Sequence, residues 1–281
     1  MIRWGVIGVG IAGRARARAL AADPRATPVL GYRGSPEAVG LEAAPSAAAV
    51  IAAVDAVAIC APDEAHPALV EAALRAGKHV VCEFPLAATA RDARRLLDLA
   101  RQQGTVLHVE HIELLGGAAQ WLRAHAPQPT AGLIGFTSAR ASAPIAIGNL
   151  ARVHRIMDVL GAPDALRIDL RAPKALQGAL RFGGVEIALD FRFAPGLPRE
   201  TRLRLDTPQG TVAQHNRTVT LDGAPVALPQ TGGLFAADQR HATARILDGA
   251  PPYVSEARLI AALALVEALD HAPLGAWLPL R

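Results

Sequence analysis

The sequence predicts an α/β protein in two parts. Residues 1–112 are expected to form a domain with a doubly wound parallel sheet, and residues 113–281 an α+β domain with a large open, mainly antiparallel sheet. Three observations predict this: strand and helix patterns alternate in the first part, a glycine-rich turn follows the first strand, and runs of alternating polarity joined by hairpin signals dominate the second part. The length of 281 residues also suits about two domains.

The first part consists of apolar strands that alternate with helices. Near-continuous apolar runs are typical of parallel strands that are covered on both faces. Ser46 and Thr89 can cap helices at their N-termini, and Gly77 and Gly104 can end them. The expected strands are 2–7, 27–32, 54–61, 79–82 and 105–109, and the expected helices are 11–22, 46–53, 67–76 and 89–103.

After about residue 112 the pattern changes to strands with one solvated face. The dipeptides Gly183-Gly184 and Asp222-Gly223 favour tight hairpin turns. We therefore expect an open antiparallel sheet followed by two helices. The expected strands are 165–171, 174–182, 185–193, 201–206, 211–215 and 218–221, and the expected helices are 118–125, 149–160, 235–248 and 255–270.

The composition excludes several classes of protein. Hydrophobic residues make up 51% and charged residues 19% of the chain, which excludes a disordered or fibrous chain. Cys60 and Cys82 have no CxxC partner, so neither a disulfide framework nor a zinc site is expected. The net charge is +4, but basic residues are scattered apart from RARAR (14–18), so no nucleic-acid binding is expected. No signal peptide or membrane span is recognisable, so a cytoplasmic protein is expected.

The glycine-rich turn reads Gly8-Val9-Gly10-Ile11-Ala12-Gly13, a full GxGxxG pattern between an expected strand and an expected helix. In this setting the first Gly allows the tight turn, the second lets a pyrophosphate approach the backbone, and the third lets helix and strand pack closely. Residues 1–112 are therefore expected to be a Rossmann domain whose turn, including Ile11 and Ala12, binds a dinucleotide.

The end of the second strand indicates which dinucleotide is bound. An enzyme that uses NAD usually places an acidic residue there for the ribose 2′-hydroxyl. This chain has Tyr32-Arg33-Gly34-Ser35 and no acidic residue before Glu37. Arg33 can pair with a 2′-phosphate and Ser35 can donate to it, so NADPH is expected, with NADH as the alternative.

Residues 57–87 read VAICAPDEAHPALVEAALRAGKHVVCEFPLA. A strand, a His in the next loop, AGKHV and an E-x-P triplet resemble the Gfo/Idh/MocA oxidoreductase family. Most sugar and polyol dehydrogenases of that family carry Lys within the triplet as a proton-transfer residue, whereas this chain has Phe84. Phe84 cannot move a proton, so the resemblance argues against a sugar dehydrogenase.

Three further segments resemble the biliverdin reductases of that family, especially the cyanobacterial type. They are LHVEHIELLGG (107–117), LARVHRIMDVLG (150–161) and GGLFAADQRHATARILDGAPPYV (232–254). Two departures stand out: the triplet usually holds Tyr where this chain has Phe84, and the stretch between Phe136 and Leu150 looks shorter.

This resemblance implies an NADPH-dependent enzyme that reduces biliverdin, a small tetrapyrrole with two propionates, at its central methine carbon C10 to give bilirubin. Arg152 and Arg155 lie three residues apart on one face of the expected helix 149–160. Arg152 is implied to stabilise charge near the reacting pyrroles, and Arg155 to hold a propionate. No metal is required.

Other side chains follow strand ends of the Rossmann domain, where open α/β sheets bind ligands. Glu83 is expected to orient the nicotinamide or its ribose, with an ion pair to an Arg as the alternative. His66 is expected either to cap a helix or to contact the cofactor. His111 is expected to be catalytic and Glu110, with Phe84, to contact substrate, with a structural hydrogen-bond role as the alternative.

Two other functions stay open at this stage. One is a related imine or carbonyl reductase that acts on another small molecule. The other is a non-catalytic dinucleotide-binding regulator, although no interaction segment outside the two domains is visible. The sequence also leaves open whether the chain forms a homo-oligomer.

Overall fold

The computed structural model describes residues 1–125, 128–139 and 145–280. The chain divides into two compact units. The first comprises Met1–Leu115 and Thr231–Ile260, and the second comprises Gly116–Gln230 and Ala261–Arg281. Among the described residues, no helix is both long enough and apolar enough to cross a lipid bilayer.

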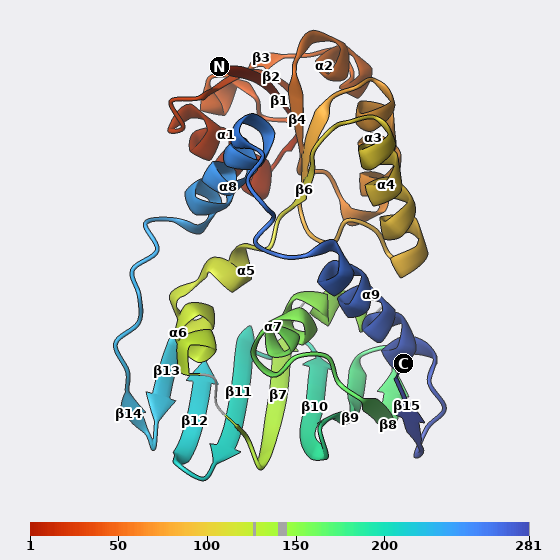
Figure 1. The fold of residues 1–281 in the computed structure, drawn as a ribbon, viewed down its shortest axis with the longest axis vertical. Coiled ribbons are helices and arrows are strands. Elements are labelled where there is room, and N and C mark those ends of the chain that lie inside the picture. Colours follow the sequence, from red (N-terminus) through yellow and green to blue (C-terminus); the bar gives the residue numbers. More distant parts are fainter. Residues whose placement is uncertain (126–127, 140–144, 281) are drawn as a thin grey trace. The chain divides into compact units, whose positions relative to one another are not determined.

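The first unit contains a six-stranded sheet in the order β3-β2-β1-β4-β5-β6, with every paired neighbour parallel. The chain order reverses between β1 and β4, which is the switch point at which doubly wound sheets bind ligands. The strands are β1 (Ile2–Val9), β2 (Ala26–Gly34), β3 (Glu42–Ala43), β4 (Ala56–Ile59), β5 (His79–Cys82) and β6 (Leu107–Val109). The helices between them are α1 (Ile11–Ala21), α2 (Ala47–Ala53), α3 (His66–Arg75) and α4 (Ala90–Gln102) (Figure 1).

The helix starts follow the local chemistry that the sequence predicts. Ser46 accepts a hydrogen bond from the Ala49 N–H and caps α2, and Thr89 accepts one from the Asp92 N–H and caps α4. An apolar cluster lies between α1 and the sheet, with Trp4 of β1 and Leu20 of α1 at 0% exposure. Burial of this kind is the main stabilising contribution in a parallel sheet with covered faces.

A helix from late in the chain completes the first unit. This helix is α8 (Leu234–Asp248), which packs against α1 and against the short helix α5 (Ile112–Leu115). Its Ala242 is fully buried in the same core as Trp4. The expected domain boundary at residue 112 stays a prediction. The first compact unit ends its first segment at Leu115 and also includes Thr231–Ile260.

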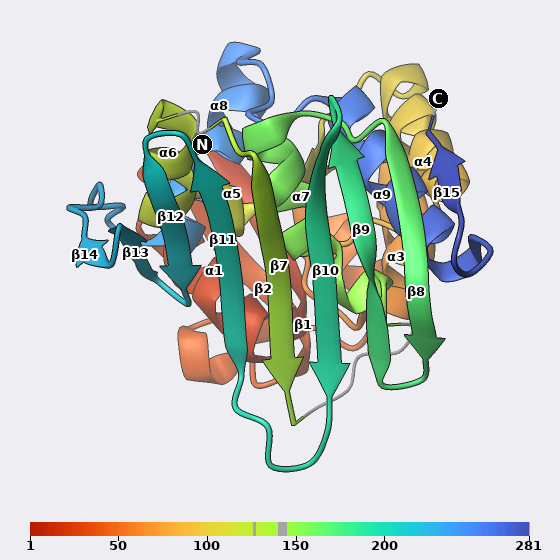
Figure 2. The same ribbon diagram turned by 90° about the horizontal axis from the view of Figure 1, so that it is seen from below.

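The second unit contains a nine-stranded sheet in the order β14-β13-β12-β11-β7-β10-β9-β8-β15. Neighbours are antiparallel except for the parallel pair β7 and β10. Figure 2 shows α6 (Gly117–His125) and α7 (Leu150–Leu160) against one face. The strands are β7 (Ala131–Ser138), β8 (Ala165–Ala172), β9 (Ala175–Phe182), β10 (Val185–Phe193), β11 (Glu200–Thr207), β12 (Gly210–His215), β13 (Thr218–Leu221), β14 (Ala224–Pro225) and β15 (Trp277–Pro279).

The expected α/β fold with a parallel and a mainly antiparallel sheet is confirmed. Both predicted hairpin turns have the backbone that two-residue turns require: φ is 57° and 92° at Gly183 and Gly184, and 48° and 81° at Asp222 and Gly223. The expected strands did not include β7, although it has eight residues, nor the short strands β3, β14 and β15. Strands of two or three residues carry no periodicity. The last helix, α9, spans Glu256–His271.

Candidate cofactor and active site

Two glycines of the turn between β1 and α1, Gly8 and Gly13, could not be replaced by another residue without a clash. Gly8 has φ +93°, and a Cβ atom there would lie 2.5 Å from the Cys60 carbonyl oxygen. A Cβ atom at Gly13 would lie 2.0 Å from the Gly8 carbonyl oxygen. The first and third glycines are thus required by the fold itself.

Gly10 differs, because a Cβ atom there would meet nothing within 4 Å. The missing side chain leaves open space over the N-terminus of α1, where no side chain caps the helix and the first turn has no acidic residue. Ile11 is 87% exposed beside this space. The first-turn N–H groups of a helix have no intrahelical partner and attract anions. The turn therefore fits the pyrophosphate of a dinucleotide.

The loop after β2 lies against this turn. The Ser35 N–H donates to the Val9 carbonyl at 3.2 Å, which places the loop at the end of β1. Arg33 is exposed, and its φ of 60° is a conformation that non-glycine residues rarely adopt. Its guanidinium lies 5.7 Å from the centre of the Tyr32 ring. Arg33 and Ser35 are thus both exposed where β2 ends.

Glu83 follows β5 and is held by one residue of α1. Arg16 donates to Glu83 Oε1 from Nη2 at 2.9 Å and from Nε at 3.3 Å, while the Cys60 thiol lies 3.7 Å from the same oxygen. The Glu83 side chain is 14% exposed and Arg16 is fully buried. The ion pair to an arginine, which was the alternative role expected for Glu83, is therefore present. The expected role of Glu83 in orienting a cofactor stays a prediction.

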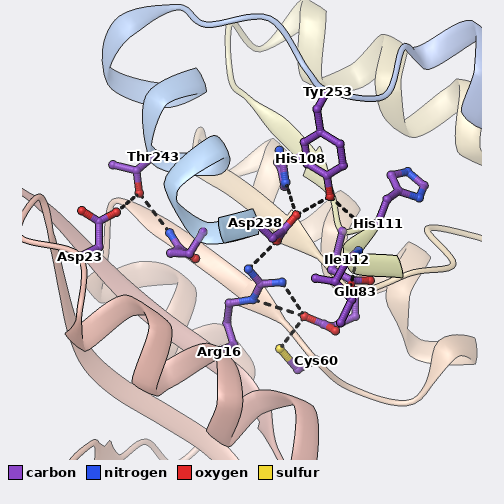
Figure 3. A network of polar contacts seen from close by, with 12 residues as sticks. Arg16, Asp23, Cys60, Glu83, His108, His111, Ile112, Asp238, Thr243 and Tyr253 are labelled. Carbon is purple, nitrogen blue, oxygen red and sulfur yellow. Dashed lines mark hydrogen bonds and ion pairs between the residues drawn. The ribbon is translucent and has the colours of Figure 1, made fainter. Parts of the chain in front are cut away.

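Arg16 is also paired with a carboxylate from α8 (Figure 3). Its Nη1 donates to Asp238 Oδ2 at 2.6 Å, and both side chains are 0% exposed. Asp238 Oδ1 accepts hydrogen bonds from the Tyr253 hydroxyl at 2.6 Å and from His108 Nε2 at 2.9 Å. The hydroxyl oxygen of Tyr253 in turn accepts a bond from the His111 N–H at 2.8 Å.

Burial and charge set the protonation of this network. Burial raises the pKa of Asp238, but the nearby Arg16 charge and the bonds from His108 and Tyr253 reverse this and hold it well below its ordinary value. Burial lowers the pKa of His108. His108 therefore donates from Nε2 to the carboxylate, and its Nδ1 accepts from Arg245 at 3.4 Å.

Phe84 and His111 form a ring contact, with their centres 4.6 Å apart. His111 and Glu110 are both 6% exposed. Glu110 accepts a hydrogen bond from the Ile112 N–H at 3.0 Å, and burial, then the charges of Glu83 and Asp238, raise its pKa well above the ordinary value. Phe84 and His111, two of the predicted site residues, are thus brought together near Glu110, whose carboxyl group favours its neutral form.

His66 is fully buried and connects two loops. Its Nδ1 lies 2.7 Å from the Pro85 carbonyl oxygen, and its Nε2 lies 2.8 Å from the Ala61 carbonyl oxygen. These contacts tie the loop after β4 to the Glu83-Phe84-Pro85 turn. The expected role of His66 as a helix cap is wrong, because none of the described side chains caps α3 and both ring nitrogens face carbonyl oxygens. Its expected role in contacting a cofactor stays a prediction.

The two predicted arginines lie on α7 in the second unit. Arg152 is 7% and Arg155 is 8% exposed, so neither is an ordinary surface arginine of this helix. The Arg152 guanidinium lies 3.5 Å from the centre of the Phe136 ring of β7, and its Nη1 donates to the Gly148 carbonyl at 3.2 Å. Their roles toward a substrate stay predictions. Part of the stretch between Phe136 and Leu150, residues 140–144, lies outside the described residues.

Sequence reasoning missed three members of the network: Arg16, Asp238 and Tyr253. A signal existed for each, because Arg16 is the centre of the only basic run, and the other two lie in the quoted segment 232–254. Among the described residues, no three His, Cys, Asp or Glu side chains are grouped in a way that would hold a metal ion.

Comparison with known proteins supports the cofactor site. Residues 2–111 match the model of an oxidoreductase family with an NAD-binding Rossmann fold, Gfo/Idh/MocA. Biliverdin reductase A of Mus musculus is 38% identical over 125 residues, which are 42% of this chain and 42% of the mouse protein. The chain thus matches less than half the length of this curated relative.

Solved structures match over nearly the whole chain. A biliverdin reductase from Synechocystis sp. PCC 6803, in complex with biliverdin and NADP⁺, has a TM-score of 0.82 and 27% identity over 95% of this chain and 98% of that one. A UDP-N-acetylglucosamine 3-dehydrogenase from Acidithiobacillus ferrooxidans also has a TM-score of 0.82, at 22% identity over 96% of each chain. The second likeness shows the fold alone.

Proposed function

We propose that the chain, whose residues 2–111 match the model of the Gfo/Idh/MocA oxidoreductase family with an NAD-binding Rossmann fold, is an NADPH-dependent reductase of biliverdin. When bound, NADPH supplies a hydride to the central methine carbon of biliverdin, and with one proton delivered to a pyrrole nitrogen the products are bilirubin and NADP⁺. Similarity to biliverdin reductases in both sequence and structure supports this substrate.

The observation that carries the proposal is the side chain of Phe84. It occupies the E-x-P position where sugar dehydrogenases of the family carry a proton-transfer Lys, and its neighbour is the His111 ring at 4.6 Å. An alcohol dehydrogenase must remove a hydroxyl proton, which an aromatic hydrocarbon cannot do. Reduction of a conjugated tetrapyrrole requires no base at that position, because a proton is gained and not lost.

The cofactor residues are supported by the geometry of the Rossmann turn. Gly8 and Gly13 allow the close backbone packing of the turn, and Gly10 leaves open space at the α1 N-terminus, where Ile11 and Ala12 would present backbone N–H groups to the pyrophosphate. Arg33 and Ser35 are proposed to bind the 2′-phosphate, since a guanidinium suits a phosphate and no acidic side chain lies between the end of β2 and Glu37.

The substrate residues are proposed from the family resemblance and from burial. Arg152 would stabilise the anion that forms as the tetrapyrrole is reduced, and Arg155 would hold a propionate by a charged hydrogen bond. A guanidinium holds its proton too tightly to act as an ordinary general acid, so water or a propionate delivers the proton. Glu83 and His111 would orient the nicotinamide end, and Phe84 and Glu110 would contact the substrate.

One observation favours a second candidate, a related imine or carbonyl reductase. Phe84 has no hydroxyl where biliverdin reductases usually have Tyr, so a bond made by that hydroxyl is missing. An imine or carbonyl substrate that needs no such bond would fit the same scaffold.

The decisive experiment is an absorbance time course of purified protein with biliverdin and NADPH. We expect the red band of biliverdin to disappear as the blue band of bilirubin grows. Arg152→Ala is expected to lower the turnover number about 100-fold, because a charge that stabilises the transition state is removed. Arg192→Ala, a matched change at an arginine of β10 whose side chain is 55% exposed, is expected to leave turnover unchanged.

Two outcomes would contradict the proposal. No conversion by a protein that still binds NADPH would exclude biliverdin and favour the second candidate. Full turnover by Arg152→Ala would contradict the role proposed for Arg152, whereas the assignment of biliverdin as the substrate would still hold.

A further inference from the structure

The buried guanidinium of Arg16 connects the dinucleotide-binding helix to Glu83. We propose that Arg16, fixed by Asp238, is a positioning residue that aligns the Glu83 carboxylate with the nicotinamide half of the cofactor. This inference rests on the proposed NADPH site. It assigns a role to three residues, Arg16, Asp238 and Tyr253, that the sequence pattern did not single out.

The contacts of Glu83 leave one carboxylate oxygen available. Both Arg16 donors and the Cys60 thiol contact Oε1, at 2.9, 3.3 and 3.7 Å. Among the described residues, no hydrogen bond to Oε2 is found. Because the side chain is 14% exposed, Oε2 can accept from a ligand. The nicotinamide half offers ribose hydroxyls and an amide N–H₂ group, which are the donors that a carboxylate binds.

Arg16 has a single orientation because its fork is bound on two sides. Nε and Nη2 face Glu83, and Nη1 faces Asp238 at 2.6 Å. Asp238 is itself fixed, since its other oxygen accepts from His108 and Tyr253. A planar guanidinium can bridge two carboxylates in this way, whereas a lysine ammonium on a flexible stem cannot hold the same geometry.

Glu83 lies at a different strand of the sheet from the residues proposed to bind the adenosine half, so the two parts of the cofactor site can be tested separately. Arg33 lies at the end of β2 and Ser35 follows it, whereas Glu83 follows β5. The sheet order β2-β1-β4-β5 puts three strand spacings between these strand ends. At about 4.8 Å a spacing, these strand ends are about 14 Å apart. Loss of Arg16 should therefore weaken contacts of the nicotinamide half and leave those of the adenosine half intact.

Equilibrium binding of two probes tests this. NADPH carries both halves, and adenosine 2′,5′-bisphosphate carries only the adenosine half. We expect Arg16→Met to weaken NADPH binding about 10-fold, the value of one hydrogen bond to a charged group, with unchanged affinity for the bisphosphate. Arg18→Met, in the same basic run but exposed, is the matched control and should change neither dissociation constant.

A second variant covers the case in which Arg16→Met does not fold. Glu83→Gln keeps the Arg16–Asp238 pair and should weaken NADPH alone by a similar factor. In the double variant Arg16→Met/Glu83→Gln, the loss should equal that of one single variant, because both changes remove the same contact.

The outcomes separate this inference from the proposed function. Equal weakening of both probes, or additive losses in the double variant, would show that Arg16 only maintains the fold, and would overturn the inference alone. A wild-type protein that binds the bisphosphate no better than adenosine 5′-monophosphate and binds no NADPH would overturn the cofactor assignment, and the inference with it.

Discussion

The Asp238→Asn variant tests the energetics of the buried network directly. Asparagine has nearly the shape of aspartate, so the change removes a charge and leaves the cavity filled. The variant leaves Arg16 at 0% exposure with Glu83 as its remaining carboxylate partner. Loss of one member of a buried ion pair is strongly destabilising, because the other charge is left desolvated.

The magnitude follows from the distances. Arg16 Nη1 and Asp238 Oδ2 are 2.6 Å apart, which gives an attraction of about 6 kcal/mol at an effective dielectric constant of about 20. Two terms reduce the net loss: Arg16 retains Glu83 at 2.9 Å, and the neutral amide no longer has the desolvation penalty of a carboxylate. We expect the free energy of unfolding of the first unit to fall by about 3–5 kcal/mol.

Urea denaturation followed by tryptophan fluorescence measures this change. Trp4 lies fully buried in the first unit, so replacing Trp121 and Trp277 with Phe makes the signal specific for that unit. Asp98→Asn is the matched control, since Asp98 pairs with Arg101 at the surface and its loss should change stability by less than about 1 kcal/mol. A loss below about 1 kcal/mol in Asp238→Asn would refute the reasoning, because the pair would then be no stronger than a surface pair.

The pH dependence supplies an independent check of sign. Burial raises the pKa of Asp238, but Arg16, His108 and Tyr253 hold it well below the ordinary 3.8. The folded state therefore binds this proton more weakly than the unfolded state. The stabilisation is present above pH 3.8 and is lost as the pH falls through the folded-state pKa. The difference between wild type and Asp238→Asn should shrink in acid, and a difference that grows there would contradict the assignment.

Two further predictions concern Glu110 and Arg33. Burial raises the pKa of Glu110, so wild-type stability should fall as the pH rises above 4.5, and Glu110→Gln should be more stable than wild type at neutral pH. The same Trp4 signal measures this, and a less stable variant would count against it. Arg33→Ala should weaken NADPH about 10-fold and leave NADH unchanged in equilibrium titrations. An unchanged ratio of the two dissociation constants would end the assignment of Arg33 to the 2′-phosphate.

Local chemistry explains which parts of the fold were predictable. The capping residues Ser46 and Thr89 accept the bonds expected of them, and the turn Gly183-Gly184 adopts the positive φ values that a two-residue hairpin requires. Each of these features depends on residues a few positions apart. The two-residue strand β3 exists only through its pairing with β2, so no local pattern could reveal it.

The candidate site was predictable where one segment carries a complete motif. The roles expected from the glycine pattern at residues 8–13 match the structure: a side chain at Gly8 or Gly13 would clash with backbone, and Gly10 leaves open space at the helix N-terminus. Phe84 and His111 were predicted as site residues from two separate segments. They contact each other because they follow β5 and β6, neighbouring parallel strands whose carboxyl ends meet.

Arg16 and Asp238 were not predictable in this way, because they lie 222 positions apart and no pattern of either segment refers to the other. The sequence does contain a chemical constraint that links them. A guanidinium on the inward face of α1, beneath a parallel sheet, requires buried carboxylates to balance its charge. Glu83 supplies one at the partly exposed strand edge, and the second must come from a helix that covers the same face. Only the folded position of α8 shows that Asp238 supplies it. The helix α8 therefore completes the first unit and, through Asp238, also holds Arg16 against Glu83.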